Sequence, residues 1–230
     1  MLLAIILENM LHRGLSSLTK VHDLSMTISP GMFVWPGDPT VLIKDIATYE
    51  REGYKVELYS STTHTGTHID APAHMLKDGK AIDEIDPSSF VQEGYVMRLP
   101  SSKQEISEGQ IKMLWNDSYD DKSILINTGW CDNIGKRQGL DFPGLSLEAA
   151  HFLVERGIKM VGIDTLGIEP YSHPDFAVHK FLLKHGVVII ECLSNLGELI
   201  EGKKYLIIAL PIKLKNSGGS MARVIALDVE

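Results

Sequence analysis

The sequence has few cysteines and no long apolar segment, and both scarcities restrict the class of protein. Cys131 and Cys192 are the only cysteines in 230 residues, which excludes a disulfide framework and a CxxC metal or redox motif. Each adjoins a strand-like segment, which favours buried thiols in a reducing cytoplasm. The apolar opening, residues 1–7, lacks the flanks of a signal peptide and is far shorter than the roughly 20 residues of a membrane span.

Positive charge is also scarce. The chain has 22 lysines and arginines against 30 acidic residues, a formal net charge of −8, and no basic run. Nucleic acid and anionic membranes need a basic face, so neither is expected as the main partner. Hydrophobic residues make up 44% and charged residues 23%, the balance of a globular protein that can bury a core. A small-molecule partner fits this composition best.

No internal repeat, low-complexity tract or flexible linker divides the chain, so we expect an N-terminal segment over residues 1–19 and one domain over residues 20–230. Several segments are typical of strands in length and β-branched content. They are residues 21–28, 55–60, 95–98, 123–128, 160–164, 187–191, 205–212 and 223–229. Residues 124–126, 187–190 and 206–210 are continuous apolar runs, which suit strands buried on both faces.

Helices are predicted between the strands of the second half. Segments 107–116 and 146–157 begin with a serine cap, and segments 146–157 and 174–186 end at a glycine. Segment 174–186 also has a proline for its first turn, and segment 193–202 is an amphipathic candidate. The sequence therefore predicts an α/β fold, a mixed sheet flanked by helices.

Residues 64–74 hold three of the nine histidines and an aspartate. Imidazole and carboxylate together are the ligands of hydrolytic transition-metal sites, and histidine also moves protons near neutral pH. Gly66 and Pro72 prevent a helix, so we expect the ligands on an irregular loop at the end of a strand. One histidine alone is usually an ordinary hydrogen-bonded residue, but four such side chains together predict a metal or catalytic site: His64, His68, Asp70 and His74.

Two later residues fit the same chemistry. His179 is expected on a helix, and Glu191 ends a buried apolar strand, where an unpaired carboxylate would be costly and a cation is a reasonable partner. A surface position for His179 and an arginine or lysine partner for Glu191 remain open. Trp35 could form an aromatic wall of a substrate pocket or simply belong to a packed loop. Weaker candidates are His151, His173 and His185.

The run His64-x-Gly66-Thr67-His68-x-Asp70-Ala71-Pro72-x-His74 closely resembles the signature of the cyclase family of metal-dependent hydrolases. That family includes bacterial kynurenine formamidase and isatin hydrolase. Later landmarks agree in order, and the resemblance spans residues 20–229. The landmarks are residues 23–25, 35–39, 128–130, 162–165, 179–183 and 191–196.

The resemblance implies a swivelling β/β/α-like fold and a division of labour at the site. His64, His68 and Asp70 would bind metal, and His74 would transfer protons. His179 and Glu191 would help to complete a second metal position. One or two divalent ions are implied, zinc first and manganese as the alternative. Family members commonly form homodimers or larger homo-oligomers.

The implied reaction is hydrolysis of an amide or formamide bond in a small molecule such as N-formylkynurenine, in the cytoplasm. The chain has no GxSxG motif, which disfavours a serine acyl-enzyme. Hydrolysis of a cyclic amide or lactone, as in isatin hydrolase, and a cyclase or dehydratase step are alternatives on the same site. A metal-binding protein without turnover is disfavoured, because such a protein has no need of the spare base His74.

Overall fold

The computed structural model describes residues 20–99, 105–131 and 140–229, and a mixed β-sheet forms their centre. Its strands are β1 (Val21–Asp23), β4 (His68–Asp70), β5 (Val91–Arg98), β6 (Ser123–Asn127), β7 (Met160–Ile163), β8 (Val188–Glu191), β9 (Tyr205–Pro211) and β10 (Gly219–Asp228). In this part of the chain they pair in the order β1-β10-β4-β8-β7-β6-β5-β9, and β9 also pairs with β10, which closes the sheet on itself. Strands β5 to β8 run parallel, and the other pairs are antiparallel.

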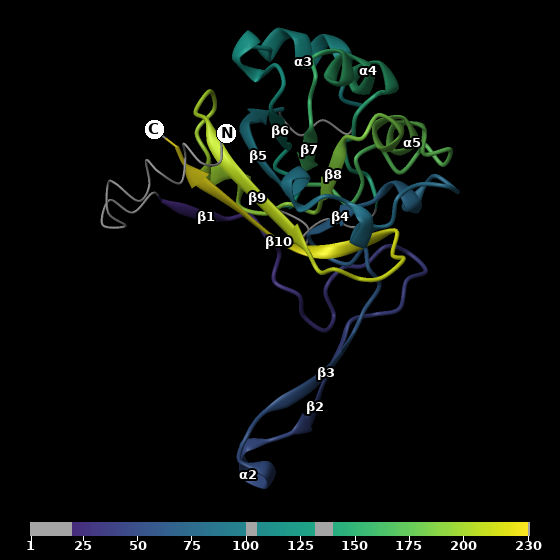
Figure 1. Cartoon of the computed structure of the whole chain (residues 1–230), viewed down its shortest axis with the longest axis vertical. Helices are drawn as coiled ribbons and strands as arrows, with labels where there is room; N and C mark the ends of the chain where they lie inside the picture. The colour runs from purple at the N-terminus through teal and green to yellow at the C-terminus, as the bar shows by residue number, and fades with distance from the viewer. Residues whose placement is uncertain (1–19, 100–104, 132–139, 230) are drawn as a thin grey trace.

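Three helices cover one face of the parallel strands: α3 (Glu108–Leu114), α4 (Leu147–Glu155) and α5 (Ala177–Lys184) (Figure 1). The side chains of Ser107 and Ser146 cap α3 and α4, as their position in the sequence predicts. One apolar core lies between the helices and the sheet, and a second core fills the space inside the closed sheet. Strands β7 and β8 are buried along their whole length, and β6 along all but its last residue. The α/β class with a mixed sheet is confirmed.

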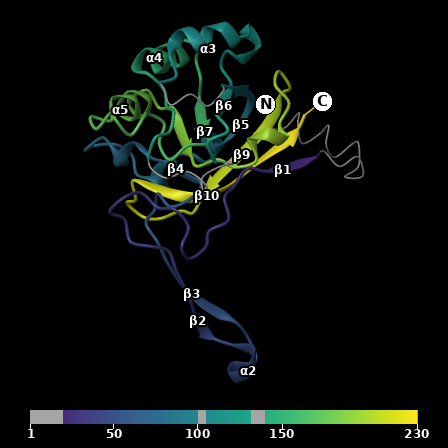
Figure 2. The same cartoon turned by 180° about the vertical axis from the view of Figure 1, so that it is seen from behind.

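A long hairpin projects away from this body (Figures 1 and 2). It consists of β2 (Leu42–Ala47) and β3 (Val56–Ser60), joined by the one-turn helix α2 (Tyr49–Glu52), and we call residues 42–60 the arm. The arm carries eight of the sixteen exposed large hydrophobic side chains of the described residues. An isolated two-stranded hairpin is marginally stable in water, so an arm of this composition is suited to association.

Most predicted elements are confirmed, with shifted ends. Segments 55–60, 123–128, 160–164, 187–191 and 205–212 each contain a strand, and segments 107–116, 146–157 and 174–186 each contain a helix. Segments 95–98 and 223–229 are parts of the longer strands β5 and β10. Pro174 lies outside α5, because Phe176 takes a left-handed conformation (φ 52°) at the helix start. Strand β9 alternates between buried and partly exposed residues, so its apolar run is covered on one face only.

One predicted element is wrong, and another is much shorter than predicted. The helix over residues 193–202 is only a 3₁₀ turn, Leu196–Glu198, because Cys192 and Asn195 adopt left-handed φ angles of 56° and 57° that interrupt a helix. The strand over residues 21–28 ends at Asp23, beyond which the segment makes only an isolated bridge at Ser25. No strand is predicted over residues 42–47, where the structure has β2.

The predicted N-terminal segment, residues 1–19, lies outside the described residues, so the domain boundary at residue 20 stays a prediction. Both cysteines are buried, as expected. Among the described helices, none is long and apolar enough to cross a membrane.

Candidate metal centre

His68 and Asp70 lie on strand β4, in the middle of the sheet. The prediction that both occupy an irregular loop is therefore wrong, because β4 pairs with β8 and β10 on its two sides. His68 is opposite Glu191 of β8, and side chains alternate along a strand, so His68, Asp70 and Glu191 share one face. Ile69 points the other way, into the core inside the closed sheet.

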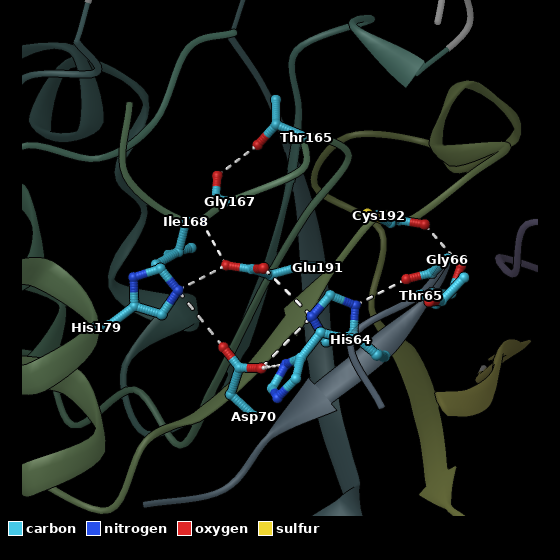
Figure 3. Close-up of polar contacts among 12 residues, drawn as sticks. His64, Thr65, Gly66, Asp70, Thr165, Gly167, Ile168, His179, Glu191 and Cys192 are labelled. Carbon is cyan, nitrogen blue, oxygen red and sulfur yellow. Dashed lines mark hydrogen bonds and ion pairs between the residues drawn. The ribbon is translucent and has the colours of Figure 1, made fainter. Parts of the chain in front are cut away.

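Asp70 is the centre of a group of imidazoles and carboxylates that we call the cluster (Figure 3). Its members are His64, His68, Asp70, His179 and Glu191. Oδ1 of Asp70 lies 2.9 Å from Nδ1 of His64 and 3.5 Å from Nε2 of His68, and its Oδ2 lies 3.5 Å from Nε2 of His179. These three imidazoles come from the motif segment, from β4 and from α5. The carboxylate of Asp70 is itself 1% exposed. One buried carboxylate thus collects three imidazoles separated by up to 115 residues, from His64 to His179.

Glu191 closes the buried side of the cluster. Its Oε1 lies 2.9 Å from Nε2 of His179 and its Oε2 lies 3.4 Å from Nε2 of His68. The backbone N–H of Ile168 donates to the same Oε1 at 2.6 Å. Imidazoles, rather than an arginine or lysine, are therefore the side-chain partners of Glu191. His179 is 5% exposed, so the surface alternative for this residue is also wrong.

The donor set fits a divalent cation. Nδ1 of His68 donates to the carbonyl oxygen of Gly66 at 2.7 Å, which leaves Nε2 facing the carboxylates. Nε2 of His68 and Oδ2 of Asp70 are buried without a hydrogen-bond partner in the described part of the chain. Such groups are costly unless something else pairs with them. One donor atom from each of His68, Asp70 and Glu191 falls within a common 4.8 Å, as does one from each of His64, Asp70 and His74.

The buried imidazoles and carboxylates stabilise each other's charged forms. Burial lowers the pKa of His179, but the charge of Glu191 and the bonds to Glu169 and Glu191 outweigh burial and raise it to about 10. His68 likewise has a pKa held well above its ordinary value, against burial, by Cys192, Glu191 and Asp70. In turn, the imidazoles hold the pKa values of Asp70 and Glu191 below their usual range despite burial. Protons on two imidazoles thus supply positive charge where a divalent cation could supply it instead.

The opposite side of the cluster faces solvent. The side chain of His64 is 23% exposed, and His74 is exposed. The two rings stack with centroids 4.0 Å apart and planes at 29°. Partial burial and the neighbouring imidazoles of His64 and His179 lower the pKa of His74 to about 4. His74 lies in the 3₁₀ turn Pro72–His74, shortly after β4. This turn places its imidazole beside His64 on the solvent-facing side of the cluster, which we call the rim.

The remaining candidates contact residues other than the donors. Trp35 is half-buried and packs against Phe142 and Tyr171, with ring centroids 6.4 and 5.3 Å away. Trp35 packs on an apolar group that includes Cys192, and Cys192 follows Glu191 in the sequence. The loop that carries Trp35 is therefore packed, which was one of its two predicted alternatives. His173 faces Glu105 at 3.6 Å, and the rings of His151 and His185 contact Phe181.

Two residues that the sequence did not single out shape the cluster. The carboxylate of Glu169 contacts Nδ1 of His179 at 2.5 Å. Gly219 of β10 lies opposite Asp70, and a Cβ placed there would come within 2.6 Å of Cε1 of His64. The ring of His64 therefore packs on bare backbone. Glu169 contacts His179 and Gly219 contacts His64 only in the folded chain, so neither is identified from its place in the sequence.

We expect Gly219→Ala to displace His64 and to weaken metal binding about 10–100-fold, the range seen when outer-shell support is lost. Gly94→Ala is the matched control, because a Cβ there would lie 2.4 Å from Ile207 Cδ1 and 2.6 Å from Ser123 O. This substitution introduces similar strain on β5, a strand that carries none of the proposed ligands. Metal titration and thermal unfolding of both variants test this. Equal metal affinities in the two variants would contradict it.

Comparisons with known proteins agree with one another. A family model described as "Putative cyclase" matches residues 22–170. The kynurenine formamidase of Bacillus cereus is 30% identical over 207 residues, covering 88% of this chain and 95% of that protein. The one of Salinibacter ruber is 30% identical over 212 residues, 90% of this chain and 96% of that protein. Isatin hydrolase A from Labrenzia aggregata superimposes with a TM-score of 0.82 at 29% identity, covering 97% of this chain and 99% of that one.

Proposed function

Because this chain belongs to the cyclase family, we propose that it is a metal-dependent hydrolase that cleaves the amide or formamide bond of a small molecule. The observation that carries the proposal is the convergence of three imidazoles on the two oxygens of Asp70. Kynurenine formamidases that match this chain over nearly their whole length support the C–N bond as the target.

The residues have distinct roles in this proposal. His64, His68 and Asp70 would hold one divalent ion, and His179 and Glu191, with Asp70 shared, would hold a second. When bound, such an ion supplies a Lewis acid that polarises a carbonyl and activates water near neutral pH. Zinc is our first choice and manganese the alternative, because imidazole and carboxylate accept both. His74, at the exposed rim, would carry the proton to the leaving amine on a ring nitrogen.

The rest of the chain would bind and orient the substrate. Trp35, held by Phe142 and Tyr171, would supply an aromatic wall near Cys192. Hydrolysis of a cyclic amide is the second candidate, favoured by the superposition on isatin hydrolases with TM-scores of 0.82 and 0.84. Both candidates use the same donors, so the shape of the substrate pocket must distinguish them.

Metal removal is the direct test of the proposal. We expect the chelated protein to lose hydrolysis of N-formylkynurenine, and zinc or manganese to restore it. Metal should also raise the melting temperature, since a ligand that binds only the folded state stabilises it by about 2.7 kcal/mol at 100 times Kd. Elemental analysis, calorimetry and parallel assays with isatin and simple lactones provide the measurements. A protein that binds neither metal and hydrolyses none of these substrates would exclude the proposal.

We also propose a homodimer or higher homo-oligomer, in the cytoplasm, with the arm in the subunit contact. Ile46 and Leu58 are 55% and 48% exposed on the arm. Burying such side chains contributes about 1.5–3 kcal/mol each, so Ile46→Glu with Leu58→Glu should weaken association by at least about 100-fold. Met113→Glu, at an 87% exposed position on α3, is the control. Light scattering after gel filtration gives the mass; an unchanged mass for the double variant would contradict the role of the arm.

A further inference from the structure

Glu169 is a buried carboxylate beside the cluster that the proposed mechanism does not use. It is 3% exposed and lies in the connection between β7 and α5. Its Oε1 contacts Nδ1 of His179 at 2.5 Å, and its Oε2 accepts from the backbone N–H of Val178 at 2.8 Å. A carboxylate only accepts hydrogen bonds, so Nδ1 of His179 must be the donor. This leaves Nε2 as the atom that faces Glu191 and Asp70 (Figure 3).

The segment that carries Glu169, residues 165–169, also contacts Glu191, the second proposed ligand that lies outside the motif segment. The N–H of Ile168 donates to Oε1 of Glu191, the oxygen that Nε2 of His179 contacts. The segment is fixed internally, because the hydroxyl of Thr165 donates to the carbonyl oxygen of Gly167 at 2.7 Å. It is also fixed from the side of β8, because the N–H of Cys192 donates to the carbonyl oxygen of Thr165 at 2.9 Å.

A neighbouring loop presses on the same segment. The N–H of Leu145 donates to the carbonyl oxygen of Ile168 at 2.7 Å. Gly144 makes this approach possible, since a Cβ there would lie 2.4 Å from the carbonyl carbon of Glu169. Glu169 therefore has little freedom to turn away from His179.

We infer that Glu169 is a positioning residue, which fixes the tautomer and direction of His179 so that Nε2 is presented to a metal ion, while Ile168 aims Glu191 at the same point. The inference rests on the proposed metal-dependent function. A carboxylate that accepts from the second nitrogen of a metal-binding imidazole is a general means of orienting it. Because Glu169 also caps the first turn of α5, the test must separate orientation from helix capping.

Zinc titration against a competing chelator, on the full chain, separates the two roles. We expect Glu169→Ala to weaken zinc binding about 10–100-fold, the usual effect of losing such a partner. The control is Ser146→Ala, which removes the buried side-chain cap of α4, bonded to the N–H of Ala149 at 3.0 Å. The control should lose stability and keep its zinc affinity within about twofold.

Histidine ¹⁵N NMR of the zinc-loaded protein gives a second readout. In the wild-type protein, the Nδ1 proton of His179, assigned by its loss in His179→Gln, should resonate far downfield because a carboxylate accepts it. The signal should disappear or move upfield in Glu169→Ala and in the nearly isosteric Glu169→Gln, which serves if the alanine variant does not fold. If Glu169→Ala binds zinc as tightly as Ser146→Ala does and the Nδ1 proton signal of His179 is unchanged, the inference about Glu169 is overturned, while the proposed function stands. A wild-type protein that binds no zinc would overturn both the inference and the proposed function.

Discussion

Replacing Asp70 with asparagine is expected to abolish metal binding and to lower kcat/KM by at least about 10³-fold. The magnitude follows because metal-ion catalysis contributes several kcal/mol, and each 1.36 kcal/mol is a factor of ten in rate. Asp70 is the one carboxylate within 3.5 Å of three imidazoles, His64, His68 and His179, in the described structure. The amide keeps the shape of the side chain but turns one acceptor oxygen into a donor and removes the charge that both proposed ions would share.

The control for Asp70→Asn is Glu93→Gln. Glu93 is a less deeply buried carboxylate on β5, and it is ion-paired at 3.0 Å to Nζ of Lys122 and at 3.1 Å to Nζ of Lys204. We expect it to lose some stability while metal content and turnover stay at wild-type values. Metal content by mass spectrometry, circular dichroism and initial rates are the measurements. If Asp70→Asn keeps its metal and more than a tenth of the wild-type kcat/KM, Asp70 is not the shared ligand.

The local part of the cluster could be predicted because its members lie close together in the sequence. The motif segment places His64, His68, Asp70 and His74 within eleven residues, so no knowledge of the fold is needed to group them. Its backbone conformation could not be predicted in the same way. The triplet His68-Ile69-Asp70 has polar residues on either side of an apolar one, which suits a strand, but it is too short to form one alone. Pairing with β8 and β10 supplies the hydrogen bonds that make it a strand.

The distant part of the cluster depended on tertiary contacts. Glu191 could be suspected from the sequence because it ends a buried apolar run, and a buried carboxylate needs a partner. Glu169 and Gly219 gave no such signal. Glu169 acts through the helix that follows it, and Gly219 matters only because strand β10 lies beside Asp70. The helix predicted over residues 193–202 is absent for a related reason. After β8, Cys192 and Asn195 take left-handed conformations, and the N–H groups of residues 193 and 194 donate to the carbonyl oxygens of Ile163 and Leu24.

His74→Ala is expected to keep its full metal content and to lower kcat by about 10²–10⁴-fold, the usual contribution of a positioned proton donor or acceptor. The geometry makes this the most informative substitution at the rim. A ring nitrogen of His74 shares a 4.8 Å neighbourhood with donor atoms of His64 and Asp70, so a ligand role is the physical rival of a proton-transfer role. A ligand role predicts loss of metal together with turnover, whereas proton transfer predicts loss of turnover alone.

Exposure of His74 supplies a second way to separate these roles. The rim is open to solvent, so added imidazole can reach the space that the alanine leaves and take over proton transfer. We expect partial recovery of kcat with imidazole in His74→Ala and no recovery in Asp70→Asn, whose carboxylate is buried. His151→Ala, an exposed histidine on α4, should match the wild-type protein in metal content and rate. Loss of metal from His74→Ala would assign this histidine to the ligand set and leave the proton to a different group.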